Sequence, residues 1–149
     1  MNMKDERQFV GYSKYRSRLV DGHVHTELCP HGSGDRTAMM IEKAIELRIE
    51  KVCLTEHAPL PIAFAAEYGG DKKAYDTASL KLNEVDTYLE LGRQLQRAYG
   101  THIDISLGFE VDYIPGFESD IQEFLDRYGP LTDDNILSVH FMEGVNNAF

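Results

Sequence analysis

Apolar and polar residues follow two different periods along the chain, one typical of strands and one typical of helices. The clearest strand signal is the strict alternation of apolar residues over 103–109, which ends at Glu110. Shorter strands are expected at 19–25, 51–55 and 136–139. Each expected strand is followed directly by polar residues that carry imidazole or carboxylate groups.

Helical spacing of apolar residues fills the intervals between these strands. It predicts three helices, which run from Asp35 or Thr37 to about Ile49, from Ser79 to Tyr99, and from Ser119 to Gly129. Ser79 and Ser119 are the expected N-caps, because a serine hydroxyl accepts a hydrogen bond from the first helical turn. Gly100 and Gly129 are expected to end their helices.

The predicted order is βαβαβαβ, which is typical of an α/β parallel sheet or barrel with its helices on the outside. The 149 residues fit one domain covering 1–149. Residues 1–18 show no clear period and are expected to form an exposed lead-in. The connection 58–78 contains several prolines and glycines, and a connection of that length predicts a loop that covers a site.

Three histidines lie close together at the end of the first expected strand. His23 and His25 are two positions apart, so their side chains point to the same side of an extended segment and can hold one metal ion. His31 follows in the next loop, close enough to reach a neighbouring ion. Ordinary surface histidines are the alternative, but three such residues at one strand end favour a metal site.

The other three strand ends carry further candidates. His57 follows Glu56, and its position at a strand end favours a ligand role over an incidental imidazole. Glu110 ends an apolar strand, where a buried carboxylate needs either a cation or a salt bridge to Lys or Arg. Asp112 can share either role, and we rank it below Glu110. His140 is either a core histidine or a ligand, and the pattern favours a ligand.

Composition and net charge narrow the classes of partner and cellular location that the chain can have. Asp and Glu number 25 against 15 Lys and Arg, a net charge of −10 that disfavours nucleic acid as a partner. No apolar stretch approaches the roughly 20 residues of a membrane span, and no signal peptide is evident, so we expect a cytoplasmic protein without a membrane partner. Cys29 and Cys53 form no CxxC unit and are read as reduced thiols, with a minor alternative that Cys29 is a soft ligand.

The candidate residues fall into four short motifs, which are Asp21-Gly22-His23-Val24-His25 with His31, Thr55-Glu56-His57-Ala58-Pro59, Gly108-Phe109-Glu110-Val111-Asp112-Tyr113, and Ser138-Val139-His140. Over about residues 19–141 the chain resembles the polymerase and histidinol phosphatase (PHP) superfamily, and within it the monofunctional histidinol-phosphatase branch. The resemblance implies a distorted (β/α)7 TIM-like barrel. The family's late Asp-x-His motif has no counterpart after His140, so this chain is expected to be about the first half of that barrel.

The resemblance also implies a role for each candidate in a site that holds up to three divalent ions, commonly zinc, manganese or iron, with fewer in this chain. The implied ligands are His23 and His25 on one ion, Glu110 as a bridge to a second, His140 on that second ion, and His31 and His57 on a third. Imidazole and carboxylate ligands without thiolate fit these ions better than calcium or magnesium. Glu110 and His25 are also the expected catalytic residues.

The implied activity is hydrolysis of L-histidinol phosphate to L-histidinol and phosphate in histidine biosynthesis, by water that the metal ions activate. The partner is then a small phosphorylated substrate, while the oligomeric state is not predicted. Alternatives are a PHP hydrolase acting on nucleotides or sugar phosphates, an amidohydrolase-type barrel, which also uses a His-x-His pair, and a non-catalytic truncated metal-binding module. The positions of His31 and of Glu56-His57 favour the PHP interpretation.

Overall fold

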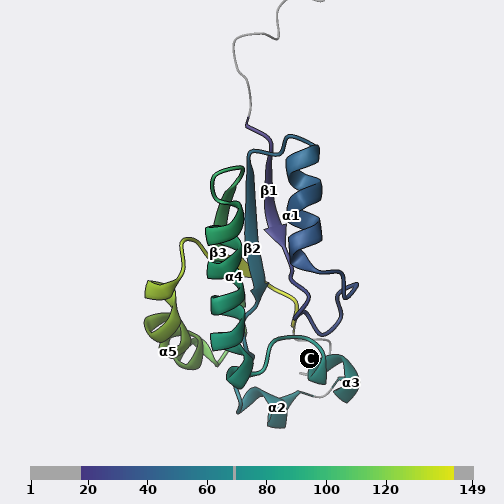
Figure 1. Ribbon diagram of the computed structural model, residues 1–149. Helices are drawn as coiled ribbons and strands as arrows, with labels where there is room; N and C mark the ends of the chain where they lie inside the picture. Colours follow the sequence, from purple (N-terminus) through teal and green to yellow (C-terminus); the bar gives the residue numbers. More distant parts are fainter. Residues whose placement is uncertain (1–17, 69, 143–149) are drawn as a thin grey trace, which may run out of the picture.

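The computed structural model describes residues 18–68 and 70–142, and within them the predicted α/β order is present. The strands form one parallel sheet in the order β1-β2-β3-β4 (Figure 1). Their bounds are Val20–Val24 for β1, Lys51–His57 for β2, Asp104–Asp112 for β3 and Ile136–Ser138 for β4. Nearly all of the predicted lead-in lies outside the described residues.

The strand register brings the predicted site residues to one end of the sheet. His57 of β2 pairs with Glu110 of β3, and Asp112 pairs with Ser138 of β4. On the other side, Val24 of β1 pairs with Leu54 of β2. Because all the strands are parallel, the polar residues that follow them meet at the carboxyl end of the sheet, where α/β barrels assemble their sites.

Three helices cover the sheet on the outside. They are α1 at Thr37–Glu46, α4 at Val85–Tyr99 and α5 at Glu118–Tyr128 (Figure 1). The residues with helical spacing in the second predicted helix form the face that α4 buries, which consists of Val85, Tyr88, Leu89, Gly92 and Leu95. Gly100 and Gly129 follow the ends of α4 and α5, as predicted.

Both predicted serine caps are wrong. Ser79 lies in a buried turn before α4, where its hydroxyl accepts from the Leu60 N–H and donates to the Leu80 carbonyl. The helical segment begins only with the short 3-10 helix η1 at Leu82–Glu84, where the Glu84 carboxylate accepts the Lys81 N–H at 2.7 Å. Ser119 lies inside α5, one residue after its start, and its hydroxyl contacts Asp120.

The connection 58–78 contains short helices that the sequence pattern did not predict. Helix α2 spans Phe64–Glu67 and helix α3 spans Lys72–Asp76, both beyond the carboxyl ends of the strands (Figure 1). The ring of Phe141 contacts two rings of this connection, with centroid distances of 5.1 Å to Phe64 and 5.6 Å to Tyr68. The connection therefore packs against the segment that carries His140.

The two outer strands leave apolar side chains exposed. Leu137 in β4 is 71% exposed and Val20 in β1 is 51% exposed, whereas the side chains of β2 and β3 are mostly buried. Within the described residues each of the two strands pairs on one side only. Among the described helices, none combines the length and the apolar character that crossing a membrane requires.

The Tyr88 hydroxyl ties helix α4 to the two central strands. This buried hydroxyl has the carbonyl oxygens of Gly108 at 2.5 Å and Leu54 at 3.0 Å as acceptors, and it accepts from the Glu56 N–H at 3.3 Å. Burial raises the pKa of Tyr88, so the hydroxyl stays protonated and available as a donor.

Tyr88→Phe is expected to lower the free energy of unfolding by about 1–3 kcal/mol, because it leaves buried backbone groups without a partner. Urea unfolding followed by circular dichroism measures the change. Tyr99→Phe is the matched control, because its hydroxyl contacts Glu42 on the surface and its loss should have little effect. Equal midpoints for the two variants would contradict the bridging role of Tyr88.

Candidate metal centre

The carboxyl ends of the strands gather all the side chains singled out from the sequence into one cluster. The ring of His25 lies 4.9 Å from His23 and 4.3 Å from His57, between centroids. The ring of His57 lies 4.9 Å from His31 and 5.4 Å from His140. Five histidines from the ends of three strands and from one loop therefore lie close together.

Glu110 lies among these imidazoles. Its Oε2 is 2.9 Å from Nε2 of His23, 3.3 Å from Nε2 of His25 and 3.1 Å from Nδ1 of His57. Its Oε1 is 3.4 Å from Nε2 of His140. The carboxylate is 3% exposed, and among the described residues its ion-pair partners are histidines only, not Lys or Arg. The structure therefore gives no support to the alternative of a salt bridge.

His23 and His25 point their Nε2 atoms at each other, 3.0 Å apart. The Nδ1 atom of His25 lies 3.1 Å from a Glu56 oxygen, to which a neutral His25 donates its proton. Nε2 of His25 then carries a lone pair. This nitrogen lies 3.3 Å from Oε2 of Glu110, so lone pairs of both atoms face the space between them. Such a meeting of nitrogen and oxygen lone pairs suits a cation.

His31 and His57 form a second pair, with 3.2 Å between their Nε2 atoms. Nδ1 of His31 donates to the Thr77 carbonyl at 2.8 Å, which leaves a lone pair on its Nε2 when the ring is neutral. A neutral His57 then has an unfavourable contact in either tautomer. A proton on Nδ1 makes the two Nε2 lone pairs face each other, and a proton on Nε2 turns the lone pair of Nδ1 towards Glu110.

The environment of His57 favours the form that binds metal ions. Burial lowers the pKa of His57 to about 4, and whenever His25 is protonated its positive charge acts in the same direction. The imidazole is therefore neutral at physiological pH. Its Nδ1 is fully buried and, although Oε2 of Glu110 lies 3.1 Å away, it makes no well-oriented hydrogen bond within the described residues. A buried nitrogen of this kind without a donor is readily explained by a bound cation.

His140 reaches the cluster with the help of Asp112. Nδ1 of His140 lies 2.9 Å from Oδ1 of Asp112, and the same oxygen accepts the His140 N–H at 3.1 Å and the Ser138 hydroxyl at 3.2 Å. The side chain of His140 is 47% exposed, as is that of His23 on the other outer strand. His140 is therefore a partly exposed member of the cluster and not a core histidine.

The cluster fits divalent ions. Three groups of potential ligand atoms lie within 4.8 Å of one another among the described residues, and they are His23, His25 and Glu110; His57, Asp112 and His140; and His25, Cys29 and His57. Imidazole nitrogens and carboxylate oxygens are the ligands that zinc, manganese and iron accept. The unfavourable contacts around His57 and Glu110 are the structural observation that supports this fit.

Sequence reasoning underestimated three residues of the site. Glu56 was given no role of its own, but it is fully buried and contacts His25. Asp112 was ranked below Glu110, yet it contacts His140 directly. Cys29 lies beside the cluster, where burial raises the pKa of its thiol and the nearby Glu56 carboxylate adds to this effect. For Glu56 the available signal was its place beside His57 at the end of a buried strand.

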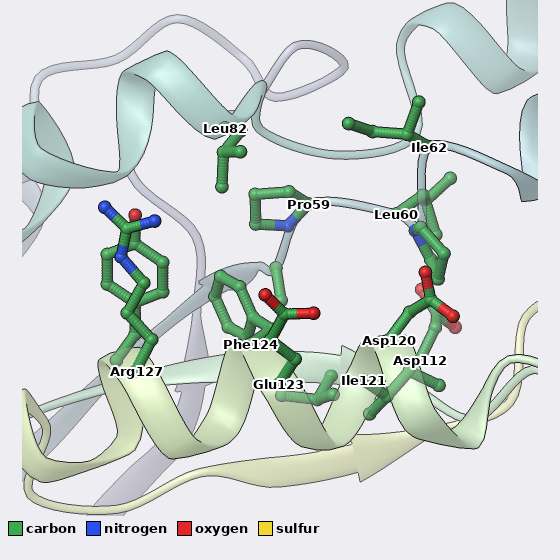
Figure 2. A pocket seen from close by; sticks show the side chains of 14 residues that line it. Pro59, Leu60, Ile62, Leu82, Asp112, Asp120, Ile121, Glu123, Phe124 and Arg127 are labelled. Atoms are coloured by element: carbon green, nitrogen blue, oxygen red, sulfur yellow. The ribbon is translucent and has the colours of Figure 1, made fainter.

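A cavity of about 190 Å³ lies on the helix side of the cluster. Figure 2 shows it between the residues that follow β2, such as Pro59 and Leu60, and the side chains of Phe124 and Glu123 from α5. Asp112 also lines it, so this carboxylate lies between the cavity and His140. The predicted loop 58–78 therefore contributes one wall to this cavity and also reaches the metal cluster through Thr77.

Comparison with known proteins identifies the family. A family model described as the PHP domain matches residues 21–149. The chain belongs to the PHP domain family. The open parallel sheet with its outer helices is therefore part of a TIM-like PHP barrel, and the fold expected from the motifs is confirmed.

The relatives of this PHP chain are histidinol-phosphatases. The histidinol-phosphatase of Bacillus subtilis (strain 168) is 41% identical over 82% of the chain, which covers 44% of that protein. A structure from Listeria monocytogenes, provisionally assigned as a histidinol phosphatase, is 44% identical with a TM-score of 0.82. The match covers 84% of this chain and 46% of the Listeria protein.

A second solved structure contains ligands. It is the histidinol phosphate phosphatase of Lactococcus lactis subsp. lactis Il1403 in complex with zinc, L-histidinol and phosphate. It is 26% identical with a TM-score of 0.64, and the match covers 84% of this chain and 41% of that protein. The chain thus spans less than half the length of the relatives it matches.

Proposed function

We propose that this chain supplies one part of a single PHP domain that hydrolyses L-histidinol phosphate to L-histidinol and phosphate with the help of divalent metal ions. The observation that carries the proposal is the cluster in which Glu110 meets four imidazoles without a Lys or Arg partner among the described residues. The names of the relatives, and the L-histidinol and phosphate bound in one of them, support the choice of substrate.

The proposed ligands follow from the contacts of the cluster. His23, His25 and Glu110 would hold one ion, and Glu110 would also reach a second ion beside His140. His31 and His57 would hold a third ion. Ions bound in this way lower the pKa of water and neutralise the negative charge on a phosphoryl group.

The residues of the chain have their own tasks in this proposal. Glu110 brings a negative charge among imidazoles and so makes the cluster attractive to cations. Thr77 keeps Nδ1 of His31 engaged, which leaves its Nε2 directed to His57. Phe141 follows His140 directly and packs against Tyr68, and these two partly exposed rings would offer an apolar wall to an imidazole-bearing substrate.

Release of phosphate from L-histidinol phosphate tests the proposal. The purified 149-residue chain is assayed with added manganese or zinc, beside a sample treated with a chelator. We expect turnover that depends on the metal and stops with the chelator. Faster turnover of a nucleotide or a sugar phosphate than of L-histidinol phosphate would contradict the proposed substrate.

A chain that binds zinc but releases no phosphate from any of these esters would favour the non-catalytic metal-binding module. That result would contradict activity in the chain alone. Extending the chain to the length of its relatives would then show whether the other part of the domain restores turnover.

A further inference from the structure

Glu56 holds together the parts of the chain that carry the metal-binding histidines. Its carboxylate is completely buried, and both of its oxygens accept hydrogen bonds. Oε1 accepts from Nδ1 of His25 and from the His57 N–H, each at 3.1 Å. Oε2 accepts from the N–H of Thr26 at 2.8 Å and from its hydroxyl at 2.7 Å. One carboxylate thus joins the end of β1 to the end of β2.

We propose that Glu56 is a positioning residue that selects Nε2 as the metal-facing atom of His25 and fixes the distance between the histidines of β1 and β2. This inference rests on the proposed function, because it assumes that the cluster binds metal ions. Glu56 is not proposed as a ligand, since its four hydrogen bonds occupy both oxygens.

The selection follows from the chemistry of imidazole. A neutral ring carries its proton on one nitrogen and a lone pair on the other. A carboxylate can only accept, so Glu56 retains the proton of His25 on Nδ1. Nε2 then keeps its lone pair, 3.0 Å from Nε2 of His23 and 3.3 Å from Glu110. Partners of this kind orient metal ligands in many sites, and their loss typically weakens metal binding about 10–100-fold.

Glutamine cannot replace Glu56, although it has almost the same shape. Its side chain has one oxygen and one NH₂ group in place of two oxygens. With the NH₂ at the Oε2 position, the buried Thr26 N–H faces another donor. With the NH₂ at the Oε1 position, it faces the His57 N–H, and His25 must move its proton to Nε2 to avoid a second clash.

Glu27 offers a matched control for this substitution. It also accepts the N–H and the hydroxyl of a threonine, Thr37, at 2.6 and 2.5 Å. It makes no hydrogen bond or ion pair to a histidine among the contacts of the described residues. Glu27→Gln therefore disturbs a similar local network without touching a proposed ligand.

The first measurement needs no variant. Long-range ¹H–¹⁵N spectra of the metal-free chain in alkaline buffer report which nitrogen of each neutral histidine carries the proton. We expect the Nδ1–H form for His25. The Nε2–H form in the wild-type chain would overturn the proposal, whether or not the chain binds metal.

The second measurement is the zinc dissociation constant, from competition with a chelator, for the wild-type chain, Glu56→Gln and Glu27→Gln. We expect zinc binding to weaken about 10–100-fold in Glu56→Gln and to stay unchanged in Glu27→Gln. Equal affinity of Glu56→Gln and the wild-type chain would overturn the positioning role. A wild-type chain that binds no zinc would instead contradict the proposed function, while the histidine spectra would still decide the role of Glu56.

Discussion

Replacing Glu110 by glutamine is expected to weaken zinc binding by at least about 100-fold, beyond the 10–100-fold typical of residues that only support a ligand, and to abolish any phosphatase turnover. Among the described residues, this carboxylate is the one group with ion-pair contacts to both outer histidines, His23 and His140, and it also meets His57. Glutamine keeps the shape of the side chain but removes the negative charge that attracts the cations.

The measurement combines a zinc titration with far-UV circular dichroism of the same Glu110→Gln sample. We expect an unchanged spectrum, because the loss is one of charge and not of packing. Glu46→Gln is the control, since within the described part of the chain Glu46 forms only an exposed pair with Lys43. Near-normal zinc affinity in folded Glu110→Gln would disprove the bridging role of Glu110.

Gly108→Ala is expected to lower the free energy of unfolding by about 3 kcal/mol, at the upper end of the range for overpacking. A methyl group at this position would overlap the backbone carbonyl of Asp134, which a small side-chain movement cannot relieve. The segment before β4 is fastened on both sides of Gly108, where Asp133 accepts the Leu107 N–H and Asn135 accepts the Phe109 N–H. The alanine therefore forces this segment away from β3.

Thermal unfolding of the metal-free chain measures this effect, and a fall of roughly 6–12 °C in Tm is expected for a domain of this size. Gly129→Ala is the control, because a methyl group there meets no atom within 4 Å. We expect its Tm to be unchanged or slightly higher. If the two alanine variants had the same Tm, the close approach at Gly108 would be of no consequence for stability.

The strands and the site could be predicted from the sequence because both depend on short-range patterns. Alternation over 103–109 correctly predicted strand β3, but the strand is buried on both faces and continues to Asp112, two residues beyond Glu110. The histidines were found because parallel strands bring their carboxyl ends together whatever the details of packing. His31 lies in the loop after β1, and it reaches His57 from there.

The details that failed depend on contacts between distant segments. Serine is a typical helix cap, but the Ser79 hydroxyl accepts the N–H of Leu60 instead. Leu60 belongs to the connection 58–78, for which the sequence pattern predicted no helix or strand. The role of Glu56 depends on Thr26, which is 30 positions away in the sequence. A single sequence does not show that these residues meet, so their roles became visible only in the folded chain.

The aromatic contacts between the connection 58–78 and Phe141 have a thermodynamic consequence. Phe141 follows His140 directly and packs on Phe64 and Tyr68, while Thr77 of the same connection holds His31. The connection thus contacts one proposed ligand, His31, and the residue that follows another, His140. A small molecule that orders this connection must therefore change the affinity of the ions, and the ions must change the affinity of that molecule by the same factor.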